Sequence, residues 1–347
     1  MGGYRAGVDA SEDGGRGPDG GGRTDGPVLG EVGERGVLAE VFAALADQPV
    51  GGVLVGPGDD TAYLRAARGA VLATTDTMVL GQDWRDDWST PQDVGVKVTT
   101  QNLADVASMG GRGTGLLVTL AAHRRLPVAW ARGLAEGMAW AARRSGVPVV
   151  GGDLSAAPDG VVMVGVTALG ELPEGVERPV LRDGARPGDV LAVSGPLGRS
   201  GAGLAQLLDG RREGPWVDYH RRPWTDLGQG PRAARAGATS MIDVSDGLVR
   251  DADRVARASD VRIDLRPGVV DELADALDGV PVAQARRAVL GGGEEHVLLA
   301  TFATSAVPSG WVVVGDVVAR AADSAAGVWL GPDRLDPAQG GWDHYGG

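Results

Sequence analysis

Apolar runs of strand length alternate with longer segments of helical spacing along most of this chain. In the first half, strand-like runs lie at 70–76, 114–121, 147–151 and 160–170. Helical spacing of apolar residues is found at 29–45, 91–110 and 127–145. The second half repeats the order, with strands at 189–195, 239–244, 261–265, 296–302 and 311–318, and helices at 199–208, from Asp246, and at 270–290. Elements in this order must bury sheets against helices, which predicts a mixed α/β fold.

Three stretches stand apart from this alternation. Residues 1–27 are rich in Gly and Asp and are predicted to form a disordered tail. The segment 172–189 is rich in turn residues and is predicted to join two domains, at 28–175 and 176–347. The segment 209–230 carries several aromatic residues and is interpreted as a surface excursion with exposed aromatics.

Charge and composition exclude several kinds of partner and site. The chain has 347 residues, a formal net charge of −13 and no cysteine. An acidic chain without a basic patch argues against binding to nucleic acid or to an anionic membrane. The absence of cysteine excludes disulfides, thiolate metal sites and Cys nucleophiles. Because the sequence shows neither a membrane-spanning apolar stretch nor an N-terminal secretory signal, we expect a cytoplasmic protein.

The sequence patterns of common nucleotide and zinc sites are missing. The chain contains no GxxxxGK[ST] motif, and its nearest stretch, SGPLGRSGAG at 194–203, has no lysine. That stretch is interpreted as a glycine turn before a helix. Zinc is not expected, because no ligand spacing is shared by the four histidines, His123, His220, His296 and His344.

Seven aspartates are the remaining candidates for a functional site, because most of these seven lie where an apolar run meets Gly, Ser or Thr. In VVGGDLS at 149–155, for example, a strand is predicted to end at Gly-Gly-Asp. Any one Asp could cap a helix or form an Asx-turn, but Asp105 lies inside a predicted helix, where capping is unavailable. Carboxylates that converge at strand ends repel one another unless protons or metal ions neutralise them. Such oxygen ligands suit Mg²⁺, which can bridge to phosphate. The candidates are Asp59, Asp60, Asp76, Asp105, Asp153, Asp243 and Asp246.

Eight short motifs follow one another in order along residues 28–345. They are GDDTA (58–62), TTD (74–76), KVTTQNLADVASMG (97–110), VGGDL (150–154), GARPGD (184–189), IDVSDGL (242–248), GGGEEHVL (291–298) and GWDHY (341–345). In this order the chain resembles the thiamine-monophosphate kinase family, within the superfamily of aminoimidazole ribonucleotide synthetase. The resemblance implies an α/β (α+β) fold of two domains, with mixed sheets flanked by helices. It also implies that the N-terminal domain carries the metal and ATP site and pairs with its twin in a homodimer.

The resemblance further implies a reaction, in which ATP phosphorylates thiamine monophosphate directly, on several Mg²⁺ ions, to give thiamine diphosphate. The nucleophile is a phosphate oxygen that is largely ionised at pH 7, so neither a covalent nucleophile nor a general base is expected. By position, the resemblance assigns metal ligands to Asp60, Thr74, Thr75, Asp76, Asp105, Asp153, Asp243 and Asp246. It assigns contacts with ATP to Gly152, Asp153, Arg182 and Ser245. Contacts with the acceptor fall to Asp83, Glu294 and Tyr345.

Three positions depart from the family pattern. Asp83 stands where the family has a substrate-contacting His, the family block SGGEDYEL reads GGGEEHVL, and Ala104 replaces the Ser of NLSD. Trp84 is open to two interpretations, an aromatic face over the cationic ring of the acceptor or a core residue. The alternatives to a thiamine-phosphate kinase are an enzyme of the same superfamily with another phosphorylated acceptor, and a non-catalytic protein that binds ATP.

Overall fold

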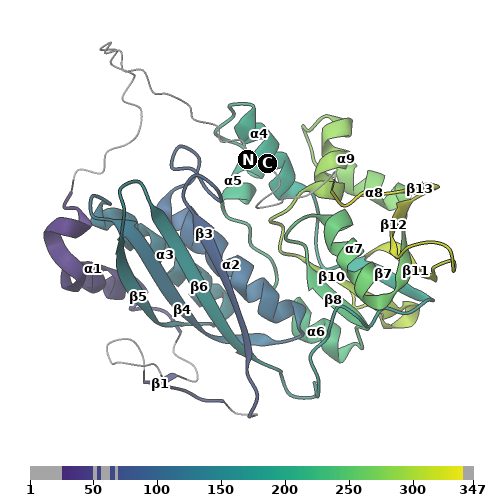
Figure 1. Ribbon diagram of the computed structural model, residues 1–347, viewed down its shortest axis with the longest axis horizontal. Coiled ribbons are helices and arrows are strands. Elements are labelled where there is room, and N and C mark those ends of the chain that lie inside the picture. The colour runs from purple at the N-terminus through teal and green to yellow at the C-terminus, as the bar shows by residue number, and fades with distance from the viewer. Residues whose placement is uncertain (1–25, 50–52, 56–62, 67–68, 339–347) are drawn as a thin grey trace, which may run out of the picture.

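Two β-sheets, one from each half of the chain, form the framework of the protein (Figure 1). The structure is a computed structural model that describes residues 26–49, 53–55, 63–66 and 69–338. The first sheet has the order β3-β6-β4-β5 and the second has the order β13-β12-β9-β11-β7-β10-β8. The predicted mixed α/β fold is confirmed. Most of the predicted tail, residues 1–25, lies outside the described residues.

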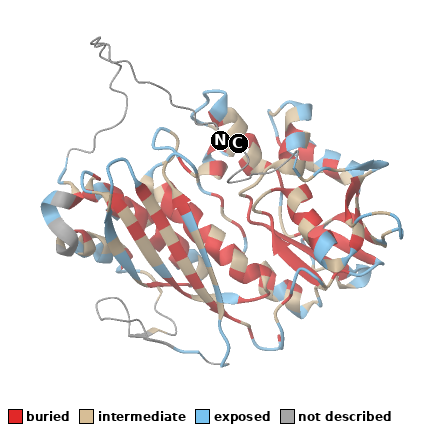
Figure 2. Ribbon diagram, in the orientation of Figure 1, coloured by how far each residue is buried: buried red, intermediate tan, exposed pale blue. Residues whose placement is uncertain are grey.

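Two long helices cover one face of the first sheet. The elements of this half are α1 (Leu29–Leu45), β1 (Val53–Val55), β2 (Tyr63–Leu64), β3 (Leu72–Val79), α2 (Pro91–Ser108), β4 (Arg112–His123), α3 (Val128–Ser145), β5 (Val149–Ala157) and β6 (Val162–Glu171). Alternate residues of a strand point to the same face. On β6, those that face α2 and α3 are almost fully buried: Val162, Val164, Val166 and Ala168. The opposite face is largely exposed or partly exposed (Figure 2). By strand register it carries the exposed residues Thr75, Leu117 and Asp153.

Glycines on both sides of the α2–α3 contact let the two helix backbones touch. A Cβ added to Gly95 would lie 2.2 Å from the backbone oxygen of Leu134. A Cβ added to Gly137 would lie 2.1 Å from the backbone oxygen of Gln92. Both distances are too short for any side chain, so the position of α2 over the sheet depends on these glycines.

The second sheet has a hydrophobic core on each face. The strands are β7 (Asp189–Val193), β8 (Ser240–Asp243), β9 (Val261–Leu265), β10 (Leu298–Ala303), β11 (Val312–Ala319), β12 (Gly327–Leu330) and β13 (Asp333–Arg334). The helices are α4 (Arg199–Leu208), α5 (Pro215–Arg221), α6 (Gln229–Arg235), α7 (Leu248–Ser259), α8 (Pro267–Asp275) and α9 (Val282–Gly291). Ile242 and Leu299 face the core under α7, α8 and α9. Phe302 faces the other core, where its ring meets that of Trp311 edge to face at 5.3 Å.

The strand predicted to end at Gly-Gly-Asp does not end there. β5 continues to Ala157, so Asp153 lies in the middle of a strand. Gly152 explains the error, because a Cβ there would lie 2.0 Å from the backbone oxygen of Val118 on β4. The glycines that indicated a turn instead permit a close approach of two strands.

The segment 209–230 is also not a surface excursion with exposed aromatics. It contains α5 and the start of α6, and Trp216, Tyr219 and Trp224 are all partly buried. The ring of Trp224 meets that of Trp140 on α3 edge to face at 5.2 Å. The segment therefore packs the second half of the chain against the first. Among the described residues, no helix is long and apolar enough to cross a membrane.

The glycine contact between α2 and α3 generates the first prediction. Gly137→Ala should lower the free energy of unfolding by about 1–3 kcal/mol or more, because the added methyl group must push two helix backbones apart. Gly268→Ala is the matched control, since Gly268 lies in α8 with nothing within 4 Å of an added Cβ. The control should raise stability by up to about 1 kcal/mol through helix propensity. Urea unfolding of both variants measures the difference, and equal stabilities would contradict the proposed contact.

Candidate active site

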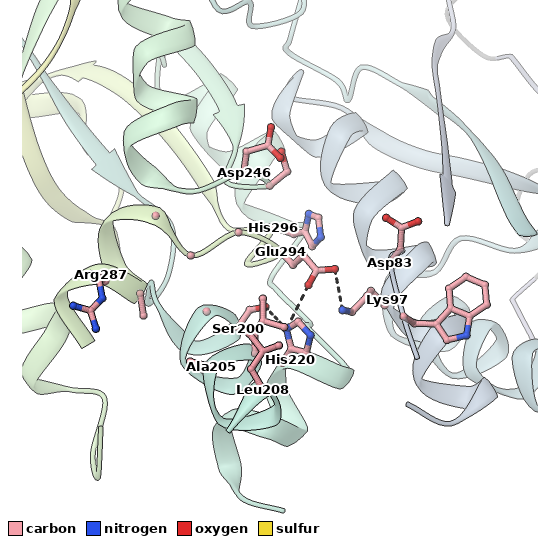
Figure 3. A pocket seen from close by; sticks show the side chains of 18 of the residues that line it. Asp83, Lys97, Ser200, Ala205, Leu208, His220, Asp246, Arg287, Glu294 and His296 are labelled. Carbon is pink, nitrogen blue, oxygen red and sulfur yellow. Dashed lines mark hydrogen bonds and ion pairs between the residues drawn. The ribbon is translucent and has the colours of Figure 1, made fainter. Parts of the chain in front are cut away.

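A cavity of about 810 Å³ lies between the two halves of the chain (Figure 3). The first half contributes the segment 81–89, which follows β3, and residues of α2. The second half contributes residues of α4, α5 and α9 and the segments 245–246 and 291–294. Its volume is that of a site for a small organic molecule.

Helix α2 presents polar residues to this region at intervals of four. Lys97 and Gln101 line the cavity, and Asp105 lies one turn further along the same face. The helix begins at a defined residue because Thr90 and Asp93 form a capping box. The Thr90 N–H donates to Asp93 Oδ2 at 2.8 Å, and the Asp93 N–H donates to Thr90 Oγ1 at 3.2 Å.

Three carboxylates from different elements interact beside the cavity: Asp76 of β3, Asp105 of α2 and Asp243 of β8. Burial, together with the charges of Asp243 and Asp76, raises the pKa of Asp105 to about 7. The pKa of Asp76 is also raised, by burial and then by Asp243. The Thr74 hydroxyl donates to Asp105 at 2.7 Å, and His296 Nδ1 lies 3.1 Å from Asp243 Oδ2. A cation placed here would relieve the repulsion between the carboxylates.

Two of the other predicted metal ligands, Thr75 and Asp153, do not join this cluster. Thr75 points to the opposite face of the sheet from its neighbours, and its hydroxyl donates to the backbone oxygen of Val166 at 2.9 Å. The strand register across β6 and β4 places Asp153 on that same opposite face. Asp60 lies outside the described residues. In the part of the chain that the structure describes, no group of three Asp, Glu or His side chains could hold a metal ion as it stands.

Ser245 and Asp246 lie in the loop between β8 and α7, where both line the cavity. Asp251 orders this loop, because one of its oxygens accepts the backbone N–H groups of Asp246 and Gly247, each at 3.0 Å. Arg254 pairs with both Asp246 and Asp251. Asp251 therefore satisfies the two backbone N–H groups that directly precede α7.

The segment 291–296 folds back against that loop. The Glu294 N–H donates to the backbone oxygen of Ser245 at 2.8 Å, and a Cβ added to Gly293 would lie 2.4 Å from the same oxygen. Glu294 and His296 both adopt positive φ, at 57° and 56°. Such backbone strain in non-glycine residues is often found at functional sites.

The Glu294 carboxylate lies between a lysine and a histidine (Figure 3). Lys97 Nζ donates to Glu294 Oε1 at 2.9 Å, and His220 Nδ1 lies 3.4 Å from Glu294 Oε2. Burial is the largest single effect and raises the pKa of Glu294, but Lys97, by its charge and its hydrogen bond, together with His220 and His296, leaves that pKa lowered. Burial, and then Lys97, lowers the pKa of His220 to about 4, so this imidazole is neutral at pH 7. The Ser200 hydroxyl lies 3.0 Å from the same His220 nitrogen.

The remaining predicted site residues are spread over several places. Asp83 lines the cavity, but its carboxylate accepts the Val79 N–H at 2.7 Å and so stabilises the turn after β3. Trp84 is a core residue with 4% of its surface exposed, and it also contributes to the cavity wall. Gly152 and Arg182 do not line the cavity. Tyr345 lies outside the described residues.

Sequence reasoning assigned no role to Lys97, His220 or His296. His220 lies in no motif, and His296 lies in GGGEEHVL at a position where the family pattern has Tyr, so tertiary packing and not a motif brings them to the site. Lys97 did carry a signal, because it is the only lysine in a chain with 33 Lys and Arg residues. A chain that uses arginine everywhere else retains lysine at one buried position of the cavity wall.

Comparison with known proteins identifies the family. Residues 58–172 match the AIR synthase related protein N-terminal domain, and residues 186–326 match the corresponding C-terminal domain. Thiamine-monophosphate kinase of Mycobacterium tuberculosis is 41% identical over 329 residues, which is 93% of this chain and 95% of the relative. The chain belongs to the thiamine-monophosphate kinase family. The same enzyme of Corynebacterium glutamicum is 38% identical over 92% of this chain and 96% of its own length.

Solved structures agree with this family assignment. AaThiL complexed with AMPPCP and TMP is 28% identical, with a TM-score of 0.69, and the match covers 93% of this chain and 100% of that one. Thiamine-monophosphate kinase from Stenotrophomonas maltophilia has a TM-score of 0.73 at 24% identity, over 86% of this chain and 96% of that one, and supports the fold alone. The predicted family is confirmed.

The carboxylate cluster generates a second prediction. At pH 8, with chelator present, Asp105→Asn should raise the thermal midpoint, because it removes one charge from three crowded carboxylates. Asp323→Asn is the matched control, since it removes the same charge from an exposed turn position in the other half of the chain. The control should leave the midpoint unchanged. Scanning calorimetry measures both variants, and a lower midpoint for Asp105→Asn would contradict the repulsion.

Proposed function

We propose that this protein transfers the γ-phosphoryl group of ATP to thiamine monophosphate, giving thiamine diphosphate. The observation that carries the proposal is the match to thiamine-monophosphate kinase at 41% identity over 93% of the chain. The cavity between the halves supports it, because Ser245, Asp246 and Glu294, three residues expected at the site, all line its wall.

The reaction asks mainly for positioning and charge neutralisation. A phosphate oxygen of the acceptor forms a bond to the γ-phosphorus, the bond from that phosphorus to the bridging oxygen breaks, and ADP leaves with the electron pair. The acceptor phosphate is largely ionised near pH 7, so it needs no general base. The neutral His220 is therefore not required as a proton acceptor. The chain's task is to hold two phosphate groups in line.

The carboxylate cluster fits Mg²⁺ in its donor chemistry. Asp76, Asp105 and Asp243 offer oxygen ligands. Burial, and then the neighbouring carboxylates, raise the pKa values of Asp76 and Asp105, so a cation would stabilise their ionised forms. We propose that these residues and Asp246 hold Mg²⁺. When bound, Mg²⁺ would supply charge neutralisation for the phosphate groups. Thr75 and Asp153 face the other side of the sheet, so in a single chain their placement does not support the same role.

On the acceptor side, we propose that Glu294 and the segment 81–89 form the wall that thiamine monophosphate meets. Trp88 is partly buried beside the cavity, and Arg85 stacks on its ring at 4.6 Å. Asp83 acts through the turn that it stabilises, because its carboxylate is engaged with the Val79 backbone.

We also propose a cytoplasmic homodimer, since ATP is supplied in the cytoplasm and one face of the first sheet is exposed in this chain. That face carries Leu117, of which 37% is exposed, beside Thr75 and Asp153. An exposed apolar residue on such a sheet face suits a protein interface.

We propose that the chain divides into two domains, at 28–175 and 176–347, because each half has its own sheet and core.

The activity itself is the third prediction. Purified protein with ATP and Mg²⁺ is incubated with a panel of phosphorylated acceptors, and thiamine diphosphate is measured by chromatography. Thiamine monophosphate should be converted with release of one ADP per product. Asp243→Asn should lower the rate by orders of magnitude, because it removes a carboxylate from the cluster. If another monophosphate is phosphorylated instead, the proposed acceptor is wrong. ATP binding without turnover would favour a non-catalytic protein.

The exposed sheet face gives the fourth prediction. Leu117→Asp should shift the protein from dimer to monomer in analytical ultracentrifugation, because it would bury a charge in the interface. Val282→Asp is the matched control, since Val282 is 72% exposed on α9 and lies in the other half of the chain. The control should sediment as the wild type does. A wild-type monomer, or a Leu117→Asp dimer, would contradict the proposed interface.

A further inference from the structure

Lys97 differs from the other cations of the cavity wall in being buried. Arg85 and Arg287 also line the cavity, but both are exposed. The Lys97 side chain is only 3% exposed. Burial of an ammonium group lowers stability unless it is paired and hydrogen-bonded. A chain that retains its only lysine in such a place has a use for the charge.

The ion pair with Glu294 holds this ammonium in place. Lys97 Nζ donates to Glu294 Oε1 at 2.9 Å, and Glu294 belongs to the other half of the chain. An ammonium group has three N–H donors, and this bond uses one of them. The neighbouring His220 is neutral at pH 7, so it does not compete for an anion. The ion pair therefore fixes the direction of the ammonium group and leaves its other N–H donors available to a ligand.

Lys97 also stands at a defined distance from the carboxylate cluster. Lys97 and Asp105 are eight residues apart on one face of α2, or about 12 Å along the helix axis. Gln101 lies between them, lines the cavity and hydrogen-bonds to Asp76. An acceptor phosphate that approaches Asp76, Asp105 and Asp243 meets negative charge on that side. A fixed cation on the opposite side would offset this repulsion.

We propose that Lys97 donates a hydrogen bond to the phosphate group of the acceptor, and that Glu294 positions Lys97 for this contact. The inference rests on the proposed function and deepens it. It changes the expected role of Glu294, from a contact with the thiamine part to a partner of the phosphate-binding cation. Lysine suits the place because its ammonium is compact, whereas the planar fork of arginine needs more room beside Glu294 and His220.

The phosphate contact is tested by comparing two ligands that differ only in that group. Thiamine monophosphate and thiamine are titrated calorimetrically into the protein with Mg²⁺ and a non-hydrolysable ATP analogue, with thiamine also measured as a competitor. In Lys97→Met, affinity for thiamine monophosphate should fall roughly ten- to a hundredfold, as expected for a lost charge-assisted hydrogen bond. Affinity for thiamine should not change. If both ligands weaken equally, or neither does, the proposed contact is wrong.

Three further measurements separate the alternatives. Arg212→Met removes a positive charge that is paired with Asp87 outside the cavity wall. Arg212→Met should leave both affinities unchanged. If it weakens thiamine monophosphate binding as much as Lys97→Met does, the loss is a general effect of charge and the proposed contact is wrong. The double variant Lys97→Met/Glu294→Gln leaves no carboxylate without its lysine partner, so it keeps the test valid if the single variant unfolds. It should show the same phosphate-specific loss. Wild-type protein that binds no thiamine monophosphate would overturn the proposed function itself, whereas wild-type binding with no loss in Lys97→Met overturns only the lysine contact.

Discussion

The backbone contact between α2 and α3 is the constraint on which the arrangement of the cavity depends. Gly95 and Gly137 allow this contact, which determines where α2 lies over the first sheet. The helix then carries Lys97, Gln101 and Asp105 at one-turn intervals, so their positions follow from that of the helix. α2 also packs against β8, α5 and α6 of the second half. A displacement of α2 would move the buried cation and the carboxylate together, relative to Glu294 and Asp243.

The charged residues around the cavity lower the stability of the protein without ligands, and the fold alone does not require them. Burial, and then the negative charges of Asp243 and Asp76, raise the pKa of Asp105 to about 7. Lys97 is also buried in the cavity wall, where its ammonium group loses hydration as the carboxylates do. Apolar residues at these positions would give a more stable protein without ligands. Proteins break local rules in this way mainly where function requires it, so the charge pattern identifies the site independently of any relative.

The order of helices and strands was predictable because apolar spacing reflects which face of each element is buried. The helix containing Asp105 and the strands containing Asp76 and Asp243 were found in this way. The end of β5 was not, because glycine indicates a turn in sequence, whereas Gly152 serves a close approach to Val118 that only the folded sheet reveals. The same limit applies to His220 and His296, whose roles depend on Ser200, Glu294 and Asp243, residues that are distant along the chain. Lys97 could have been predicted as a site residue, since the sequence shows that it is the only lysine of the chain.

The altered block GGGEEHVL shows how a family motif can change without removing its main contact. Glu295 is fully buried, and its carboxylate accepts the backbone N–H of Ser200 at 2.6 Å, at the start of α4. Val297 is buried in the core of the second half, and its backbone oxygen accepts the Val244 N–H. His296 directs one ring nitrogen to Asp243. Gly291 and His296 line the cavity together with the retained Glu294, whereas Glu295 and Val297 do not. The changes are therefore divided between the wall and the residues behind it. Because Glu294 keeps its place in the wall and its hydrogen bond from Lys97, the altered block is compatible with the acceptor of the family.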